Sequence, residues 1–132
     1  MKLVLDANAA LEIALAGAAQ KNFETRLKQA DEILVPELFL AEVANALWQA
    51  HKINGRDWDD CQRALDIATS LPNTVVAQQP LLFDVFHLSK QQNTRAAYDM
   101  FYLALARREG ASLLTLDGPL KKEAKRAGVR LV

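Results

Sequence analysis

The sequence predicts an α/β sandwich built around a mostly parallel sheet of four or five strands. Short apolar runs, typical of buried strands, recur along the chain and alternate with longer segments of helical periodicity. Strands that are separated by helices in this way generally pair in parallel. The 132 residues, about half of them apolar, suffice for one core, so we expect a single domain spanning residues 1–132.

The N-terminal third of the chain is expected to contain two strands and two helices. An uninterrupted apolar run before Asp6 and another before Pro36 are typical of buried parallel strands. Between them lie an alanine-rich segment, which Gly17 is expected to end, and a segment with apolar residues on one helical face. In order, the expected elements are a strand at 3–5, helices at 8–15 and 19–30, and a strand at 33–35.

The middle third is expected to be mostly helical. Apolar residues recur with helical period from residue 37, and Asn54-Gly55 is a typical helix end. Asp57 or its neighbours can cap the next helix, which should stop before Pro72, and Pro80 can open another one. In order, we expect helices at 37–53 and from about 57 to 71, a strand at 74–77 and a helix from 80 to about 91.

The C-terminal third supplies the last elements. Asn93 or Thr94 is expected to cap a helix that continues through Glu109, with Gly110 as its stop. The apolar run that follows predicts a strand at 112–115, and Pro119 opens the last helix. In order, the expected elements are a helix from 93 or 94 to 109, a strand at 112–115, a helix at 119–127 and a short fifth strand at 129–132.

Composition narrows the class of protein. The formal net charge is zero, so nucleic-acid binding would have to come from a local patch rather than from overall charge. Cys61 is the only cysteine, which excludes an intramolecular disulfide, and no Cys/His metal-binding spacing is present. The first apolar run ends too soon for a signal peptide, and no apolar segment reaches membrane-spanning length. We therefore expect a cytoplasmic protein without membrane contact.

Four acidic residues are expected to meet at one edge of the sheet. In open parallel sheets, sites form beyond the carboxyl ends of the strands, and Asp6 and Asp117 each lie just past an expected strand. Glu42 lies in the second turn of a helix that starts at the same edge. The helix that carries Asp99 runs antiparallel to the following strand, which brings Asp99 to this edge as well.

The surroundings of these acids point to a metal site. Asp99 and Glu42 lie in helical segments with few polar neighbours, where a carboxylate needs a specific role. Clustered carboxylates repel one another, and a divalent cation such as Mg²⁺ or Mn²⁺ relieves that repulsion. The sequence therefore predicts a hard-cation site made by Asp6, Glu42, Asp99 and Asp117.

Each acid, taken alone, also has a simpler explanation. Asp6 and Asp117 could be only the N-caps of the helices that follow them. Asp99 could serve a helix dipole, although we expect it to lie past the first turn, where that effect fades. Glu42 could be a solvated helix residue. The joint arrangement of all four favours a shared site.

At these residues the sequence resembles the PIN-domain nucleases, and among them the VapC-type toxins of bacterial toxin–antitoxin pairs. The four segments that carry the resemblance occur in family-like order and spacing over essentially the whole chain. They are Leu5-Asp6-Ala7-Asn8, Pro36-Glu37-Leu38 through Glu42-Val43-Ala44-Asn45-Ala46-Leu47, Tyr98-Asp99-Met100-Phe101-Tyr102-Leu103-Ala104-Leu105-Ala106, and Leu114-Thr115-Leu116-Asp117.

The resemblance implies a PIN-like three-layer α/β/α fold and an activity, metal-dependent hydrolysis of RNA. It places Asp6, Glu42, Asp99 and Asp117 around the Mg²⁺ or Mn²⁺ site, with Asp6 and Asp99 as first candidates for direct ligands. Asn8 and Thr115 match positions that orient these carboxylates, although Ser or Thr is more usual at position 8. The resemblance also implies a cognate antitoxin and a homodimer.

Contacts to RNA and to protein partners are expected from residues outside the acids. The C-terminal quarter is rich in positive charge that could hold phosphates, and Arg95 could approach the site or form an ion pair with Asp99 one helical turn away. The basic side chains could equally be solvated helix faces. The candidates are Arg95, Arg107, Arg108, Lys121 and Lys122, with Lys125, Arg126 and Arg130 nearby; the candidate apolar anchors for partners are Phe23, Phe39, Trp48 and Trp58, each of which could also be core.

Three other functions remain open from the sequence. The first is RNA processing by the same fold without an antitoxin, and the second is an inactive module that binds RNA or protein. The presence of all four acids argues against an inactive module. The third is a phosphatase-like hydrolase with Asp6 as nucleophile, which the absence of an Asp-x-Asp motif disfavours because position 8 is Asn.

Overall fold

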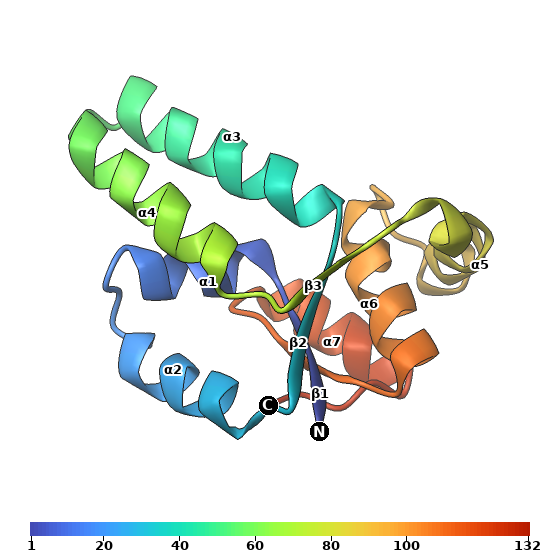
Figure 1. Cartoon of the computed structure of the whole chain (residues 1–132). Helices are drawn as coiled ribbons and strands as arrows, with labels where there is room; N and C mark the ends of the chain where they lie inside the picture. Colours follow the sequence, from blue (N-terminus) through green and yellow to red (C-terminus); the bar gives the residue numbers. More distant parts are fainter.

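The computed structural model describes residues 1–132 and contains one sheet of four strands between helices (Figure 1). The strand order is β3-β2-β1-β4, and every neighbouring pair is parallel. The prediction of an α/β fold around a parallel sheet is therefore confirmed. The strands are β1 (Lys2–Leu5), β2 (Glu32–Pro36), β3 (Thr74–Val76) and β4 (Ser112–Leu114).

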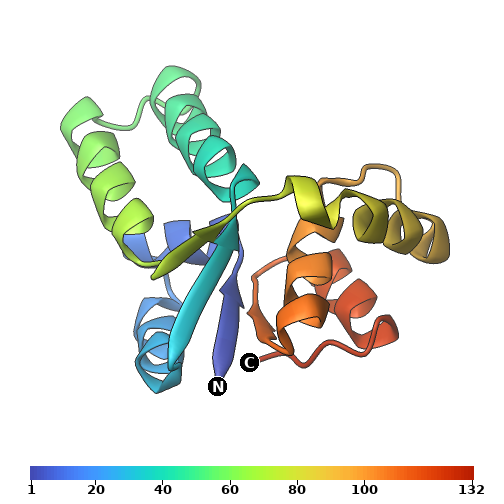
Figure 2. The same cartoon turned by 45° about the vertical axis from the view of Figure 1, so that its right-hand side comes forward.

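The seven helices are divided into two layers, one on each face of the sheet, as Figure 2 shows. The N-terminal helices pack on one another on one face, while α6 lies directly against β1, β2 and β4 on the other. None of the helices is both long and apolar enough to cross a bilayer. The first layer contains α1 (Ala7–Ala14), α2 (Gln20–Gln29), α3 (Leu38–Lys52) and α4 (Trp58–Ser70); the second contains α5 (Leu82–Gln92), α6 (Tyr98–Glu109) and α7 (Gly118–Arg126), and a short 3₁₀ turn, η1 (Gln79–Leu81), precedes α5.

The core lies where the two helical layers meet the central strands. Leu3, Val4 and Leu5 of β1 have no exposed surface, because β1 is paired on both edges and covered on both faces. This explains why the strand is apolar at each position rather than alternating. The edge strand β3 is shorter than β1 and largely exposed. It pairs only with β2, so its other edge is not covered by a strand.

The expected fifth strand is absent. Leu131 forms a single parallel bridge with Leu113 of β4. Two backbone hydrogen bonds hold it, from Leu113 N to Arg130 O and from Val132 N to Leu113 O. The segment therefore covers the edge of β4 at one point without extending the ladder.

The start of α6 differs from the prediction that Asn93 or Thr94 caps it. Asn93 has a φ of +52° and ends α5 in the left-handed conformation, which asparagine tolerates better than most residues. The helix begins at Tyr98, after Ala97. Asparagine favours both helix starts and left-handed helix ends, and here Asn93 ends α5 instead of starting α6. Asp99 consequently lies in the first turn of α6, not beyond it.

The end of α1 also differs, because the left-handed residue is Ala16 (φ +55°) and not Gly17. The lack of a side chain at Gly17 has another cause. A Cβ there would lie 2.2 Å from the Glu12 carboxylate, whose Oε1 accepts a hydrogen bond from the Ala19 amide. Gly17 thus makes room for a side chain that ties α1 to the start of α2, while alanine carries the unfavourable backbone angle.

Replacing Ala16 with glycine is expected to stabilise the protein by up to about 1 kcal/mol. Glycine removes the steric cost of the left-handed conformation, and this gain exceeds the entropy that glycine adds to the unfolded chain. Chemical denaturation of Ala16→Gly would measure the effect. Ala18→Gly is the matched control, since Ala18 is exposed in the same turn without a positive φ; a gain of equal size there would contradict the explanation.

Candidate active site

Four carboxylates from separate segments meet at the carboxyl edge of the sheet. Asp6 directly follows β1, Glu42 lies in the second turn of α3, Asp99 is in the first turn of α6, and Asp117 precedes α7. Their charges act on one another: Glu42 and Asp99 both raise the pKa of Asp6, Asp99 raises that of Glu42, and Asp117 raises that of Asp99. We call these four residues the acid cluster.

Asp6 is the most buried member of the acid cluster, with 5% of its surface exposed. Its Oδ2 accepts a hydrogen bond of 2.6 Å from the Thr115 hydroxyl. Burial, opposed by this hydrogen bond and aided by the charges of Glu42 and Asp99, raises the pKa of Asp6 from 3.8 to about 7. Asp6 occupies the N-cap position of α1, but its side chain makes no capping hydrogen bond. The carboxylate is thus directed into the site rather than used as a helix cap.

Glu42 is positioned by a buried tyrosine that the sequence analysis did not single out. The hydroxyl of Tyr102, on α6, donates a hydrogen bond of 2.6 Å to Glu42 Oε1. Burial raises the pKa of Glu42, the Tyr102 hydrogen bond lowers it, and the charge of Asp99 raises it. Burial, together with the charge of Glu42, also raises the pKa of Tyr102, so its hydroxyl keeps its proton. In sequence, Tyr102 looked like an ordinary core aromatic one helical turn after Tyr98.

The charge of Asp99 acts on two other members of the acid cluster. Burial, followed by the charge of Asp117, raises its own pKa, and its charge in turn raises the pKa of Asp6 and of Glu42. In the first turn of α6 the helix dipole favours a carboxylate, so part of its placement has the structural explanation considered for the sequence. The half-buried side chain is nevertheless surrounded by acids, which a dipole contact alone does not require.

The loop after β4 is held by the two residues expected to orient the carboxylates. Thr115 bonds Asp6 and also accepts a hydrogen bond from the Asp117 amide at 3.0 Å. The Asn8 side-chain oxygen accepts a bond of 3.1 Å from the Leu116 amide and lies 3.3 Å from the Thr115 hydroxyl. Asn8 therefore contacts the loop rather than a carboxylate. Asp117 also caps α7, with Oδ1 3.5 Å from the Leu120 amide.

The PIN domain sequence profile matches residues 3–125. The chain belongs to the PIN-domain family. Ribonuclease VapC3 of Pyrobaculum aerophilum is 30% identical to it over 125 residues, covering 93% of this chain and 95% of that protein. The range that the PIN profile matches includes all four residues of the acid cluster, so the resemblance to PIN-domain proteins is confirmed.

Solved structures share the same three-layer PIN fold. PAE2754 from Pyrobaculum aerophilum superposes with a TM-score of 0.74 at 24% identity, over 93% of this chain and 79% of that one. VapBC2 from Rickettsia felis, bound to a DNA fragment from their promoter, gives 0.70 at 20% identity, over 100% and 98%. FitAcB from Neisseria gonorrhoeae gives 0.67 at 13% identity, over 98% and 95%.

This PIN domain brings a fifth acid towards the cluster. Burial raises the pKa of Glu123, on α7, and the charges of Asp99 and Asp117 raise it further, while Arg126 lowers it. The signal in the sequence was weak, because Glu123 stands among four basic residues of an otherwise ordinary amphipathic helix. No group of three or more Asp, Glu, His or Cys side chains is arranged so that it could hold a metal ion without other ligands.

The candidate RNA-binding residues of the PIN domain divide into three groups. Lys121 and Lys122 are exposed in the first half of α7, close in sequence to Asp117. Arg95 lies outside α6 and is exposed. It forms none of the ion pairs of the chain, so of the two alternatives considered for it, the ion pair with Asp99 is wrong. Arg107 and Arg108 lie in the last turn of α6, about 12 Å along the helix from Asp99.

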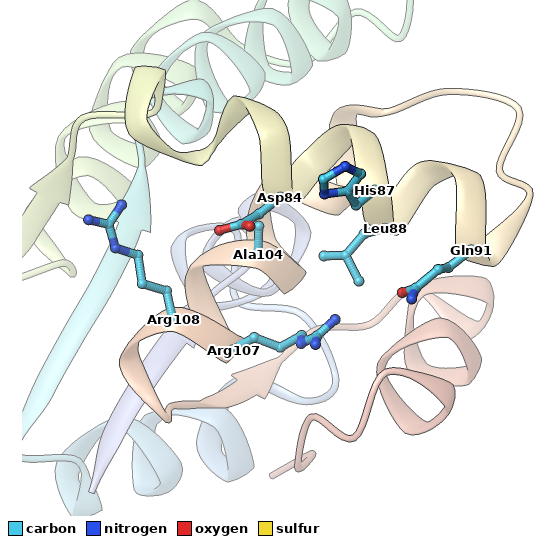
Figure 3. Close-up of a pocket in the computed structure, with 7 residues that line it drawn as sticks. All are labelled: Asp84, His87, Leu88, Gln91, Ala104, Arg107 and Arg108. Carbon is cyan, nitrogen blue, oxygen red and sulfur yellow. The ribbon is translucent and has the colours of Figure 1, made fainter.

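Arg107 and Arg108 instead line a separate hollow of about 520 Å³ between α5 and α6 (Figure 3). In this view, Asp84, His87 and Gln91 project from α5 towards the C-terminal half of α6. The hollow contains no member of the acid cluster. Arg107 and Arg108 therefore do not lie beside Asp6 or Asp99, and a ligand that they bind would sit away from the acid cluster.

Proposed function

We propose that this protein is a divalent-metal-dependent ribonuclease that hydrolyses RNA phosphodiester bonds and is the toxin of a VapBC-type toxin–antitoxin pair. The observation that carries the proposal is the meeting of four carboxylates from distant segments around a buried aspartate whose pKa is raised to about 7. Structural caps and dipole contacts do not require such a cluster, which costs stability in the absence of a cation. The similarity to a ribonuclease named VapC3 supports the same activity.

The donor set fits a hard divalent cation. Carboxylate oxygens are the ligands that Mg²⁺ and Mn²⁺ prefer, and the mutual repulsion within the cluster is what a cation would relieve. Mg²⁺ usually keeps several waters and is held by one or two carboxylates, which agrees with an open cluster that does not enclose an ion by itself. Asp6 and Asp99 are the first candidates for direct ligands, and Glu42 and Asp117 would act directly or through water.

The protein's own residues prepare the site for this chemistry. When bound, a divalent cation activates a water and stabilises negative charge on the phosphate and the leaving oxygen. Thr115 fixes one oxygen of Asp6, and Tyr102 fixes Oε1 of Glu42, which leaves the second carboxylate oxygens available. Lys121 and Lys122 can offset the repulsion between the acids and an incoming phosphate.

The Tyr102→Phe variant is expected to lower activity or metal affinity by about 10- to 100-fold, the usual effect of losing a residue that orients a ligand. Phenylalanine keeps the ring that fills the core, so the free energy of unfolding should change little and the loss of activity should not result from unfolding. Cleavage rates and metal titrations of wild type, Tyr102→Phe, Glu42→Gln and the double variant would measure the effect. Because the amide oxygen introduced by Glu42→Gln could still accept this hydrogen bond, the decisive background is Glu42→Ala, which removes the acceptor. If Tyr102→Phe lowers metal affinity as much in the Glu42→Ala background as in wild type, the hydroxyl does not act through Glu42.

The proposal includes a protein partner and a homodimer. Of the four candidate anchors, Phe23 and Phe39 are buried in the core, whereas Trp48 and Trp58 are 52% and 49% exposed. The two tryptophans flank an apolar hollow of about 220 Å³ between α3 and α4. An exposed aromatic surface of this kind suits an antitoxin contact. Co-expression with the product of an adjacent small reading frame, followed by purification, would test it, and sedimentation would test the dimer.

The first experiment on activity is cleavage of structured and unstructured RNAs with Mg²⁺, with Mn²⁺ and with EDTA. The expected result is cleavage that requires the metal, together with a rise in melting temperature on metal addition. Cleavage that persists in EDTA would contradict metal dependence. A protein that neither cleaves RNA nor gains stability from either metal would favour the inactive binding module.

A further inference from the structure

Three members of the acid cluster have a nonpolar, solvent-exposed neighbour in the chain. Leu40 lies two residues before Glu42, Tyr98 directly precedes Asp99, and Leu116 directly precedes Asp117. Exposed nonpolar side chains beside a polar site commonly mark a surface that a ligand covers. Tyr98 is the aromatic one among them, and it is also the most exposed, at 64%.

The position of Tyr98 follows from that of Tyr102. Residues four apart lie on the same face of a helix, so Tyr98 is one turn before Tyr102 on the face that reaches Glu42. The N-terminus of α6 is at the carboxyl edge of the sheet, so this turn leads from the buried part of the cluster towards solvent. Tyr98 therefore lies one turn nearer than Tyr102 to the N-terminal end of α6, where Asp99 also lies, and its ring is exposed there.

We infer that Tyr98 is a stacking surface for an unpaired nucleobase of the RNA strand, next to the phosphate that the acid cluster receives. The inference rests on the proposed ribonuclease function and adds to it a residue that contacts the substrate beside the cleaved bond. Bases of single strands stack on exposed aromatic side chains, whereas bases within a duplex are not free to do so.

Electrostatics favours a base as the group that contacts this ring. A nucleobase is uncharged, so it can lie beside Asp99 without the repulsion that a phosphate would meet there. Stacking on the neutral ring supplies attraction that does not depend on charge. Tyr98 would thereby hold the strand while the phosphate is left to the acid cluster and the lysines of α7.

The test combines a change in the ring with a change in the base. After the cleaved bond has been mapped with wild-type protein, single-stranded oligoribonucleotides are made with an intact or an abasic nucleotide on each side of it. The kcat/KM of each substrate is measured for wild type, Tyr98→Leu and Tyr98→Phe. Phe83→Leu is the matched control, because Phe83 is 81% exposed on α5, next to Asp84 in the hollow that contains no member of the acid cluster.

We expect Tyr98→Leu to lower kcat/KM about tenfold on the intact substrate, the size of effect that stacking on one aromatic side chain gives. On the substrate that lacks the stacked base, the same substitution should cost almost nothing, since the interaction is already lost. Tyr98→Phe, which keeps the ring, should stay within about threefold of wild type. Phe83→Leu should match wild type on every substrate.

Two results would overturn the inference while leaving the ribonuclease in place. One is an equal loss on intact and abasic substrates. The other is unchanged RNA kinetics of Tyr98→Leu combined with weaker self-association or antitoxin binding, which would assign the ring to a protein contact. Failure of wild type to cleave any RNA is a different outcome, because it would remove the proposed function itself. Melting curves of each variant identify any loss caused by misfolding.

Discussion

The Asp99→Asn variant is expected to lose metal-dependent RNA cleavage by at least about a hundredfold, and to lose the stabilisation that metal gives. Asp99 is the acid whose charge raises the pKa of both Asp6 and Glu42, so its carboxylate interacts with both of them. Loss of a residue that only orients a ligand already costs about 10- to 100-fold, and loss of a ligand should cost more. Initial rates with Mg²⁺ and with Mn²⁺ would measure the effect.

The metal-free Asp99→Asn protein should be at least as stable as wild type, because the substitution removes one of several mutually repelling carboxylates. A large fall in its melting temperature would therefore mean that the loss of activity has a structural cause. Asp66→Asn is the matched control, since Asp66 is an exposed acid on α4 outside the acid cluster. Activity of Asp99→Asn equal to that of Asp66→Asn would place the catalytic site elsewhere.

The stability of the metal-free protein is expected to fall as the pH rises from about 4 to 8. The pKa of Asp6 is 3.8 in the reference state and about 7 in the folded chain, so the folded state binds the proton more tightly. The contribution is fully present below pH 3.8 and is lost as the pH rises through about 7. The change should amount to a few kcal/mol, with about 4 kcal/mol as its upper limit.

Denaturation in EDTA at several pH values would reveal this dependence. Asp6→Asn should flatten the curve, because its amide does not titrate in this range and can still accept the Thr115 hydrogen bond. Saturating Mg²⁺ should restore stability at pH 8 in wild type and much less in Asp6→Asn. Curves that are parallel for the two proteins would show that Asp6 is ionised in the folded state at ordinary pH.

The parts of the fold that the sequence predicted well are those fixed by local pattern. Apolar runs ending at Asp6 and Pro36 marked the buried strands, because a parallel sheet covered on both faces leaves no room for polar alternation. The position of the acids at one edge follows from the parallel topology, because the carboxyl ends of parallel strands lie at the same edge of the sheet. This prediction does not depend on any contact between side chains.

The errors arose where one residue type suits two structures or where tertiary packing decides. Asn93 suits both a helix start and a left-handed helix end, and only the path of the chain after α5 selected the second. Tyr102 had the spacing of a core residue, and its hydroxyl acquires a role only because α3 brings Glu42 to it. Arg107 and Arg108 were grouped with Lys121 by charge, although the direction of α6 carries them away from the acids.

The hydrogen bond between Thr115 and Asp6 joins residues that are 109 positions apart, and β1 has β4 as one of its two partners in the sheet. Because β4 is made after β1, the second edge of β1 is covered only once β4 has been synthesised. At translation rates of about 5 to 20 residues per second, this interval lasts roughly 5 to 20 seconds. During that time the acid cluster is incomplete, because Asp99 and Asp117 are made long after Asp6.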